Sequence, residues 1–348
     1  MRLSDFDFHL PEHLIAQEPP AERGSSRLLV VDRRTGRWSD ARIADLPSHL
    51  ASGDLLVVNN SRVIPARLLG HRVPSGGRVE CLLLRRLDDR RWDVLLHPGQ
   101  KMKPGTRARF GEPPHVLELE VLSQHTFGRR TVTLTAPGGV PVDAVIDAIG
   151  HMPLPPYIKR PDTPTDRDRY QTIYATRRGS VAAPTAGLHL TADLLGRLER
   201  AGIGRTEITL HVGYGTFKPI RDEDISRHVI DPEPFEIDAV AAARINATRV
   251  AGGRIVAVGT TTTRTLEAVA TEHGGRIEAA AGEAALFIRP GHRFRVVDAL
   301  LTNFHLPKSS LLVLVCAFAG RELVLEAYQH AIREGYRFYS YGDAMLII

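Results

Sequence analysis

Hydrophobic residues in the second half of the chain recur in two alternating patterns. Short unbroken apolar runs, as in buried strands, alternate with longer stretches in which apolar residues recur every three or four positions, as on one face of a helix. The predicted strands are 206–212, 252–258, 295–301 and 336–348, and the predicted helices are 191–202, 238–250, 263–275, 310–320 and 321–335. Strands that alternate with helices predict an α/β fold with a mixed sheet flanked by helices.

Residues 65–149 follow a different pattern. Six short β-type runs are separated by the turn sequences SGG, DD, PG and GG, which is typical of a small all-β barrel or a sandwich. The earlier run DLLVVNN, at 54–60, has the character of a buried strand and belongs with the α/β sheet. We therefore predict a discontinuous α/β domain formed by residues 1–64 and 150–348, into which a small all-β barrel domain, residues 65–149, is inserted.

The composition of the 348 residues excludes several classes of protein. The apolar fraction of 43% supports a buried core, and the opening segment MRLSDFDFHLPEH has acidic residues and no apolar stretch, so no secretory signal is expected. The longest apolar run, LLVLVCAFA, is far shorter than the roughly 20 residues of a membrane helix. We expect a cytoplasmic protein that does not enter a membrane.

The two cysteines, Cys81 and Cys316, each lie inside an apolar run. A disulfide framework or a cysteine-ligated metal is therefore not expected, and no other metal-ligand pattern is evident. We predict no metal site.

The net charge of +5 is unevenly distributed. Residues 151–180 carry six Lys and Arg against three Asp, whereas residues 222–238 carry seven acids against one Arg. The basic region is either a solvated loop with interleaved charges or a surface that binds phosphates. Charge alone leaves both interpretations open.

Polar residues gather directly after the predicted strands, where open α/β sheets bind ligands. Gly259 and four threonines lead to Arg264, a pattern that either caps a helix or binds an anion. His211 ends a strand before Gly213, Tyr214 and Gly215. Further candidates are Thr185, Gly187 and His189 before a helix, and Asn59, Asn60, Arg62 and Arg67 after the buried strand at the domain boundary.

The insert NFHLPKS lies between two apolar runs and brings together Asn303, Phe304, His305 and Lys308. Ser309 or Ser310 is suited to cap the helix that follows, and Pro307 suits a turn. Capping explains the serines and the proline but leaves the other polar residues unexplained. We therefore expect this insert to form a catalytic lip, although each histidine alone is more often structural.

The polar stretches together resemble a known family. NNSRVIPARL, GHMPLPPYIKRP, YQTIYA, VAAPTAGLHLT, TLHVGYGTFKPI, VGTTTTRTLE, LTNFHLPKSSLL and YRFYSYGDAMLI are similar, in this order, to motifs of the S-adenosylmethionine:tRNA ribosyltransferase-isomerase family of queuosine biosynthesis. The resemblance spans nearly the whole chain. Each motif alone is weak, but eight in the same order are specific.

The resemblance implies a tRNA-modifying transferase. Such an enzyme moves and isomerises the ribosyl group of S-adenosylmethionine onto 7-aminomethyl-7-deazaguanine in the tRNA anticodon, which forms epoxyqueuosine and releases adenine and methionine. S-adenosylmethionine is then a substrate, and no tightly bound cofactor is expected. The expected partner is a tRNA with a GUN-type anticodon that carries the deazaguanine precursor, bound by a monomer. The family fold, an α/β domain with a β-barrel domain, agrees with the pattern above.

The implied chemistry assigns hypothetical roles to the candidate residues. Histidines suit the proton transfers, so the catalytic candidates are His211, His305 and His189, with Asp343 for ribose hydroxyls or the substrate amine. Aromatic faces attract a sulfonium and adenine, which selects Tyr214, Phe217 and Phe304. Arg264 is expected to clamp the methionine carboxylate with Thr261 and Thr262. The remaining expected binding residues are Asn59, Asn60, Arg62, Arg67, Thr185, Gly187, Gly213, Gly215, Asn303 and Lys308.

One departure and two alternatives accompany this interpretation. The family usually has a small residue where this chain has Tyr214, so the tyrosine is expected to fill or cap a pocket near His211.

A nucleotide-dependent transferase that uses the threonine-rich turn for phosphate would bind ATP and not S-adenosylmethionine. A non-catalytic RNA-binding module is the second alternative, although no aromatic RNA-binding motif or strongly basic tract supports it.

Overall fold

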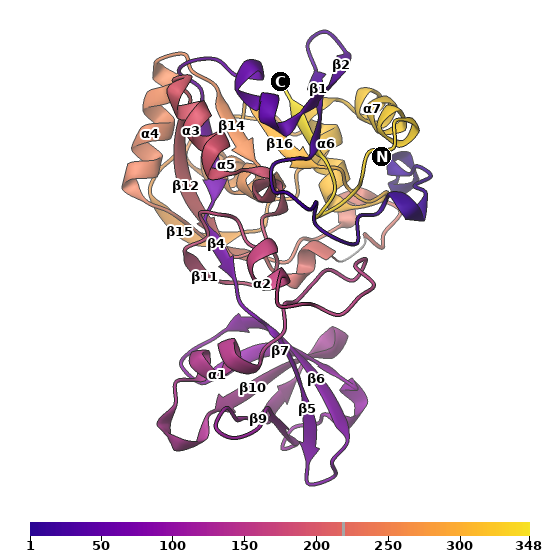
Figure 1. Ribbon diagram of the computed structural model, residues 1–348, viewed down its shortest axis with the longest axis vertical. Helices are drawn as coiled ribbons and strands as arrows, with labels where there is room; N and C mark the ends of the chain where they lie inside the picture. The colour runs from indigo at the N-terminus through magenta and orange to yellow at the C-terminus, as the bar shows by residue number, and fades with distance from the viewer. Residues whose placement is uncertain (218–219) are drawn as a thin grey trace.

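The structure, a computed structural model, describes residues 1–217 and 220–348, apart from the side chains of Phe127 and Phe217. A nine-stranded sheet with helices on both faces forms the larger body, and a closed six-stranded barrel projects from one end of it (Figure 1). The predicted fold class, a mixed α/β sheet with an inserted barrel, is confirmed.

The large sheet is mixed, and its central strands are parallel. Its strands are, in spatial order, β15 (Ala280–Ala284), β13 (Glu233–Ile237), β12 (Gly204–Leu210), β3 (Leu55–Asn59), β14 (Ile255–Val258), β16 (Ala299–Asn303), β17 (Ala344–Ile347), β1 (Arg27–Asp32) and β2 (Arg37–Arg42). Strands β12, β3, β14 and β16 run in the same direction, and β17 is antiparallel to β16. The carboxyl ends of the four parallel strands and the amino end of β17 therefore share one edge.

Both faces of the central strands β3, β14 and β16 are buried, and alternate residues of each strand point to opposite sides. Leu55 and Val57 of β3 pack under α4 (Ala239–Val250), α5 (Thr260–Glu272), α6 (Ser310–Ala319) and α7 (Arg321–Arg333). Leu56 and Val58 pack under α3 (Ala192–Arg200) on the other face. A strand covered on both sides has a continuous apolar sequence, which explains the run DLLVVNN.

Two predicted helix caps are present in the structure. Thr191 Oγ1 accepts a hydrogen bond from the backbone N–H of Leu194 at 3.1 Å and begins α3. Ser309 Oγ accepts from Leu312 at 3.1 Å and begins α6. The side-chain oxygen in each case satisfies a backbone donor that has no partner within the helix.

Three local predictions were wrong or incomplete. The four threonines belong to the first turn of α5 and do not precede it, because Gly259 adopts φ +93° and turns the chain before Thr260. Residues 336–343 form a loop and only Ala344–Ile347 is a strand. Strands β1, β2, β13 and β15 were not predicted; β2 and β15 have mostly exposed residues and so lack the apolar pattern of a central strand.

The barrel closes in the order β10 (Arg129–Thr135), β7 (Arg91–His97), β6 (Arg78–Arg86), β5 (Arg67–Val73), β8 (Arg107–Phe110) and β9 (Leu117–Gln124). Neighbouring strands are antiparallel throughout. Alternate residues such as Cys81, Leu83 and Val94 fill the interior, and α1 (Val142–Ile149), which was not predicted, adds Val145 and Ile146 to this core.

The barrel is joined to the larger body through a short parallel ribbon of β4 (Ser61–Val63) and β11 (Arg177–Ser180). Arg178 binds both carboxylate oxygens of Asp147 on α1, at 2.8 and 2.9 Å. Arg85 of the barrel pairs with Glu283 of β15 at 2.6 Å. The return segment, residues 150–176, contains the short helix α2 (Asp166–Arg169).

Within the described part of the chain, no helix has the length and apolarity needed to cross a membrane. Nor do the side chains of residues 1–217 and 220–348 include a group of three or more His, Cys, Asp or Glu placed to hold a metal ion.

Candidate active site

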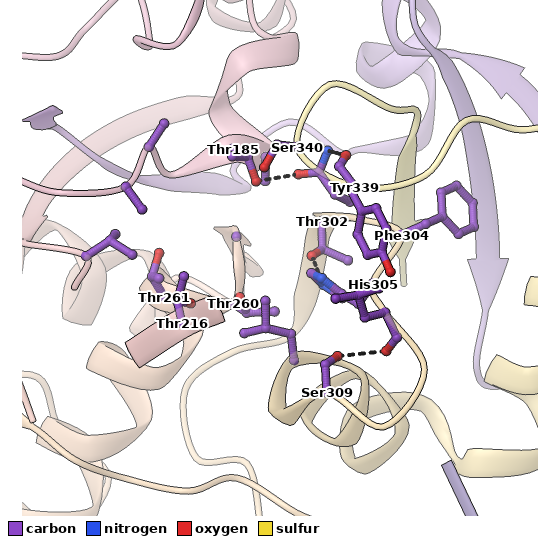
Figure 2. Close-up of a pocket in the computed structure, with 18 of the residues that line it drawn as sticks. Thr185, Thr216, Thr260, Thr261, Thr302, Phe304, His305, Ser309, Tyr339 and Ser340 are labelled. Carbon is purple, nitrogen blue, oxygen red and sulfur yellow. Dashed lines mark hydrogen bonds between the residues drawn. The ribbon is translucent and has the colours of Figure 1, made fainter. Parts of the chain in front are cut away.

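A cavity of about 380 Å³ opens at the edge of the sheet where the parallel strands end (Figure 2). Several predicted residues line it, and so do several that were not predicted. The lining consists of Pro156, Tyr157, Ala182, Ala183, Pro184, Thr185, Ala186, Val212, Thr216, Gly259, Thr260, Thr261, Thr302, Asn303, Phe304, His305, Leu306, Pro307, Lys308, Ser309, Leu311, Tyr339 and Ser340. Segments from distant parts of the chain therefore meet at one site, as ligand sites in open α/β sheets do.

His305 is the histidine that lines this cavity. Its Nε2 lies 2.9 Å from Thr302 Oγ1, and its backbone N–H donates to Tyr328 Oη at 3.0 Å. Within the described chain Nδ1 has no hydrogen-bond partner. Burial lowers the pKa of His305 to about 3, because the charged ring would lose its hydration. The side chain is a neutral imidazole at physiological pH, and a neutral imidazole can accept a proton.

Two aromatic residues, Tyr157 and Tyr339, also line the cavity, and Tyr339 lies beside His305 (Figure 2). The rings of Tyr157 and Tyr339 stack with centroids 4.5 Å apart and an interplanar angle of 23°, and the Tyr157 hydroxyl is hydrogen-bonded to that of Ser340. Tyr339 Oη is buried and has no hydrogen-bond partner among the described residues. Burial raises the pKa of both phenols, so both hydroxyls are neutral.

Two residues that line the cavity have left-handed backbone conformations, Lys308 with φ +60° and Tyr339 with φ +73°. They are the two non-glycine residues of the described chain with positive φ. Such conformations cost about 1 kcal/mol or more per residue and often occur at functional sites. The Lys308 side chain pairs with Asp7 at 2.7 Å and so lies at the rim.

The first turn of α5 supplies two threonines to the cavity, Thr260 and Thr261. The hydroxyls of Thr262 and Thr263 instead donate to the carbonyls of Val258 and Gly259, at 2.8 and 3.1 Å. The repeated threonines therefore have different surroundings. Thr261 faces the cavity as predicted, whereas Thr262 is turned into its own helix and does not line the cavity.

Asn303 lines the cavity and, together with His189, forms a hydrogen-bonded layer at its edge. The Asn303 amide donates to His189 Nε2 at 3.0 Å and to the Tyr339 carbonyl at 3.1 Å, and its oxygen accepts from Thr185 Oγ1 at 3.1 Å. Because His189 Nε2 accepts, Nδ1 carries the hydrogen and donates to Ser26 Oγ at 2.9 Å. Burial, together with the charge of Arg23, lowers the pKa of His189 to about 4. His189 itself does not line the cavity.

Arg264 points away from the cavity, toward β13. It is buried and forms an ion pair with Glu233, and Glu233 Oε1 accepts the backbone N–H of Gly213 at 2.8 Å. Burial lowers the pKa of Arg264 to about 10. Glu233 therefore links the loop that contains Gly213 to α5. In this structure Arg264, which was predicted to bind the methionine carboxylate, binds the Glu233 carboxylate instead.

His211 and Asp343 lie at the same edge of the sheet but outside the cavity lining. His211 is half-buried against Gly179, its Nδ1 has no partner among the described residues, and its pKa is lowered by burial and by Arg177. Asp343 accepts backbone N–H groups of Arg27 and Arg337, both at 2.8 Å, and burial raises its pKa. Its bonds show a structural role in the loop before β17.

The residues predicted at the domain boundary are engaged elsewhere. Asn59 is buried and bridges β3 to both backbone groups of Leu210, at 2.9 and 3.1 Å. Asn60 bonds Glu207 and Thr209 at 3.2 and 2.8 Å. Arg62 is exposed, and Arg67 pairs with Glu80 at 2.7 Å beside a second cavity. None of these four side chains lines the first cavity.

The predicted aromatic residues have separate surroundings. The Phe304 ring is fully buried in a cluster with Tyr328, Tyr336 and Phe338, with centroids 5.0–5.5 Å apart, and it points away from the cavity (Figure 2). Tyr214 lines the second cavity and not the first. The side chain of Phe217 lies outside the described part of the structure.

At two of the predicted glycines, neighbouring side chains leave no room for a Cβ atom. A Cβ on Gly187 would lie 2.1 Å from Tyr174 Oη, and one on Gly215 would lie 2.8 Å from Asp231 Oδ2. These residues pack the loops around the cavity and do not line it.

Sequence reasoning missed Tyr157, Thr216, Thr260, Thr302, Tyr339 and Ser340. Tyr157 lies in a proline-rich connection, and Tyr339 and Ser340 lie in a segment predicted to be a strand. Thr302 directly precedes Asn303 in β16, and both residues line the cavity. Its position next to a predicted site residue was the available signal for Thr302.

The cavity combines an aromatic wall, several hydroxyls, the amino end of a helix and one neutral imidazole. Aromatic faces bind planar rings and cations, and the amino end of a helix favours an anionic group. The site therefore suits a ligand with a heterocycle and a carboxylate.

Known proteins resemble the whole chain. The family model described as queuosine biosynthesis protein matches residues 3–347. Proteins named S-adenosylmethionine:tRNA ribosyltransferase-isomerase from Pelotomaculum thermopropionicum and Symbiobacterium thermophilum are 51% and 50% identical, over 100% of both chains in each comparison. The crystal structure of an S-adenosylmethionine tRNA ribosyltransferase from Thermotoga maritima is 37% identical, with a TM-score of 0.56, over 99% of this chain and 100% of that one. With such matches along its full length, this chain belongs to the S-adenosylmethionine:tRNA ribosyltransferase-isomerase family of queuosine biosynthesis.

Proposed function

We propose that this protein transfers the ribosyl group of S-adenosylmethionine to the aminomethyl group of 7-aminomethyl-7-deazaguanine in a tRNA anticodon. The sugar is isomerised, epoxyqueuosine forms, and adenine and methionine leave. One observation carries the proposal: a chain that matches this family over residues 3–347 has, at the carboxyl edge of its sheet, a cavity suited to a heterocycle and a carboxylate.

The cavity is arranged to hold S-adenosylmethionine by its two ends. The adenine ring or the sulfonium would contact the face of Tyr339, which stacks on Tyr157. The methionine carboxylate would lie at the amino end of α5, where Thr260 and Thr261 line the cavity. Arg264 would reach this carboxylate only by leaving Glu233, so the threonines are the nearer donors.

His305 is the proposed general base. Its lowered pKa, about 3, makes the imidazole neutral, so it cannot supply a proton to adenine from its resting state. The same low pKa makes the buried ring a weak base, so accepting a proton from the substrate ammonium or from a sugar carbon through Nδ1 requires that the bound substrate raise the pKa of His305, while Thr302 orients the ring through Nε2. Protonation of adenine would then require a different donor, or the proton that His305 has already taken.

The layer next to the cavity supports these groups. Asn303 ties the Tyr339 carbonyl to Thr185 and His189, and Asp343 fixes the loop that carries Tyr339. We assign these residues to positioning, together with Asn59. His211 is retained as a candidate only if substrate binding moves the adjacent loop, because its ring lies outside the cavity lining in this structure.

The tRNA is proposed to approach along the barrel side. Residues 65–149 contain 13 Lys and Arg against 9 Asp and Glu, a net +4 out of +5 for the whole chain, and positive charge favours contact with phosphates. Arg62 and Lys308 are exposed enough to meet the anticodon loop. We propose a GUN-type anticodon, a monomeric enzyme in the cytoplasm, and domain boundaries at residues 64/65 and 149/150.

The direct test has two stages. Isothermal titration should show saturable binding of S-adenosylmethionine, and an assay with precursor-containing tRNA should release adenine in proportion to the modified nucleoside formed. ATP binding without S-adenosylmethionine binding would favour a nucleotide-dependent transferase. Binding of tRNA without adenine release would favour an RNA-binding module.

A further inference from the structure

A second cavity, of about 500 Å³, lies between the barrel and the proline-rich connection. Its size falls within the range of known ligand sites. It is lined by Arg67, Glu80, Leu82, Leu95, Leu96 and His97 of the barrel, by residues 152–156 and 158–162 of the connection, and by Val181 and Tyr214 of the α/β body. The reaction proposed above assigns no role to it.

The two cavities share a thin wall. Pro156 lines both of them, and its neighbours Tyr157 and Ile158 line the first and the second respectively. Val181 faces the second cavity and Ala182 the first. Consecutive Cα atoms are 3.8 Å apart, so the wall is only one or two residues thick at these places.

The same division occurs in the loop after β12. Tyr214 lines the second cavity, and Thr216, two residues later, lines the first. One short loop therefore contributes to both sites. Anything that fills the second cavity lies directly beside the wall of the first.

The lining of the second cavity has the chemistry of a nucleobase site. Leucines, prolines and Met152 provide an apolar surface, and Tyr214 provides an aromatic one. Arg67 and Glu80 lie at its barrel side as a hydrogen-bonded pair, 2.7 Å apart. Proteins recognise single-stranded RNA by stacking splayed bases on aromatic side chains and bonding their polar edges.

We propose that the second cavity takes an unstacked base of the anticodon loop, from the nucleotide next to the modified one, and that Tyr214 is its stacking face. This inference rests on the proposed function. The modified base must bring its amine into contact with the ribose in the first cavity, and the wall of Pro156 and Ala182 separates the second cavity from that point. The adjoining cavity therefore suits the neighbouring nucleotide, and the positive net charge of the barrel favours its phosphate.

Cross-linking tests the placement without requiring turnover. A precursor anticodon stem–loop would carry a photoreactive thiouridine on one side of the modified nucleotide or on the other, and the cross-linked peptides of the wild-type protein would be mapped by mass spectrometry. We expect one of the two positions to cross-link to Tyr214 or to residues 152–158. Cross-links confined to other parts of the protein, from both positions, would overturn the proposal.

A pair of variants tests the stacking role. Tyr214→Leu removes the aromatic face, and we expect KM for tRNA to rise about tenfold, since stacking on an aromatic ring contributes about 1–3 kcal/mol per base. KM for S-adenosylmethionine should stay within twofold. Tyr214→Phe keeps the face and should retain the wild-type KM for tRNA.

The outcomes separate this inference from the function on which it rests. A wild-type protein that releases no adenine on precursor tRNA would contradict the proposed function. An active wild-type protein whose Tyr214→Leu variant keeps both KM values and its melting temperature would contradict the stacking role alone.

Discussion

The cavity wall and the layer next to it occupy the same edge of the sheet but differ in how their polar groups are used. Thr302 and His305 line the cavity, and His305 Nδ1 has no partner within the described chain. Asn303, which also lines the cavity, and His189 use nearly all of their polar atoms within the protein. A polar motif at a strand end therefore contains two kinds of residue. Some have polar atoms left to contact a ligand, and others use their polar atoms to hold the first kind in position.

Low pKa values do not distinguish the two histidines. Burial lowers the pKa of His305 to about 3 and that of His189 to about 4, so both rings are neutral at physiological pH. The two histidines differ in their ring nitrogens: His305 Nδ1 has no partner within the described chain, whereas both ring nitrogens of His189 are hydrogen-bonded. Substitutions at the two histidines and at their neighbours should therefore have different effects.

The largest effect is expected for His305→Ala. Loss of the proposed base should reduce turnover by about 10²- to 10⁴-fold, measured as adenine released per enzyme on precursor tRNA. Circular dichroism should show an intact fold. Turnover within tenfold of wild type would remove His305 from the catalytic group and leave the cavity as a binding site only.

Acid should destabilise the protein before its carboxylates titrate. In the unfolded chain both histidines have a pKa near 6.5, so below that pH the unfolded state binds protons that the folded state does not. Stability is therefore fully present above pH 6.5 and falls by about 1.4 kcal/mol per pH unit for each histidine as the pH is lowered toward 4.

Denaturant titrations measure this loss directly. Between pH 6.5 and pH 5 the free energy of unfolding should fall by about 3 kcal/mol, the combined effect of His189 and His305. The variant His189→Gln should show about half of that dependence. An unfolding free energy that stays constant across this window would show that the two rings are not buried as neutral groups.

Asn303→Ala should act mainly on stability. It leaves Thr185, His189 and the Tyr339 carbonyl without a shared partner, which we expect to cost about 2–3 kcal/mol. Chemical denaturation measures it, with Thr185→Val as a control that removes one of the bonds. A variant as stable as wild type would mean that solvent replaces the amide.

The smallest effects should separate two neighbouring threonines. Thr261→Val should raise KM for S-adenosylmethionine a few-fold, equivalent to about 1 kcal/mol, because Thr261 lines the cavity. Thr262→Val should leave KM within twofold, because the Thr262 hydroxyl bonds the Val258 carbonyl. Equal effects of the two changes would contradict the arrangement of this helix turn.

The fold was predicted at most places where apolar patterning is strong, although the buried run RLLVVD of β1 was missed. The continuous run of β3 indicates a buried strand, the short runs of residues 65–149 indicate a barrel or a sandwich, and the insertion of this domain follows from the change of period. The edge strands β2 and β15 expose most of their residues, and the YSYG loop contains aromatic residues that resemble a strand. Local pattern does not specify these segments, because their conformation depends on tertiary contacts.

The site was predictable as a location but not as a set of side chains. Sequence places Asn303, His305, Thr185 and Thr261 after strands, and the structure brings them together. The sequence does not reveal that the Phe304 side chain points into an aromatic cluster or that Arg264 pairs with Glu233 of β13. Those orientations depend on partners far away in sequence, so a single chain read in order cannot supply them.

A crystal structure with S-adenosylmethionine bound would show where the substrate lies. We expect the ligand in the cavity of about 380 Å³, with its carboxylate near Thr260 and Thr261 and its ribose beside His305. Ligand density in the second cavity, or at any site from which His305 is out of contact, would contradict this expectation.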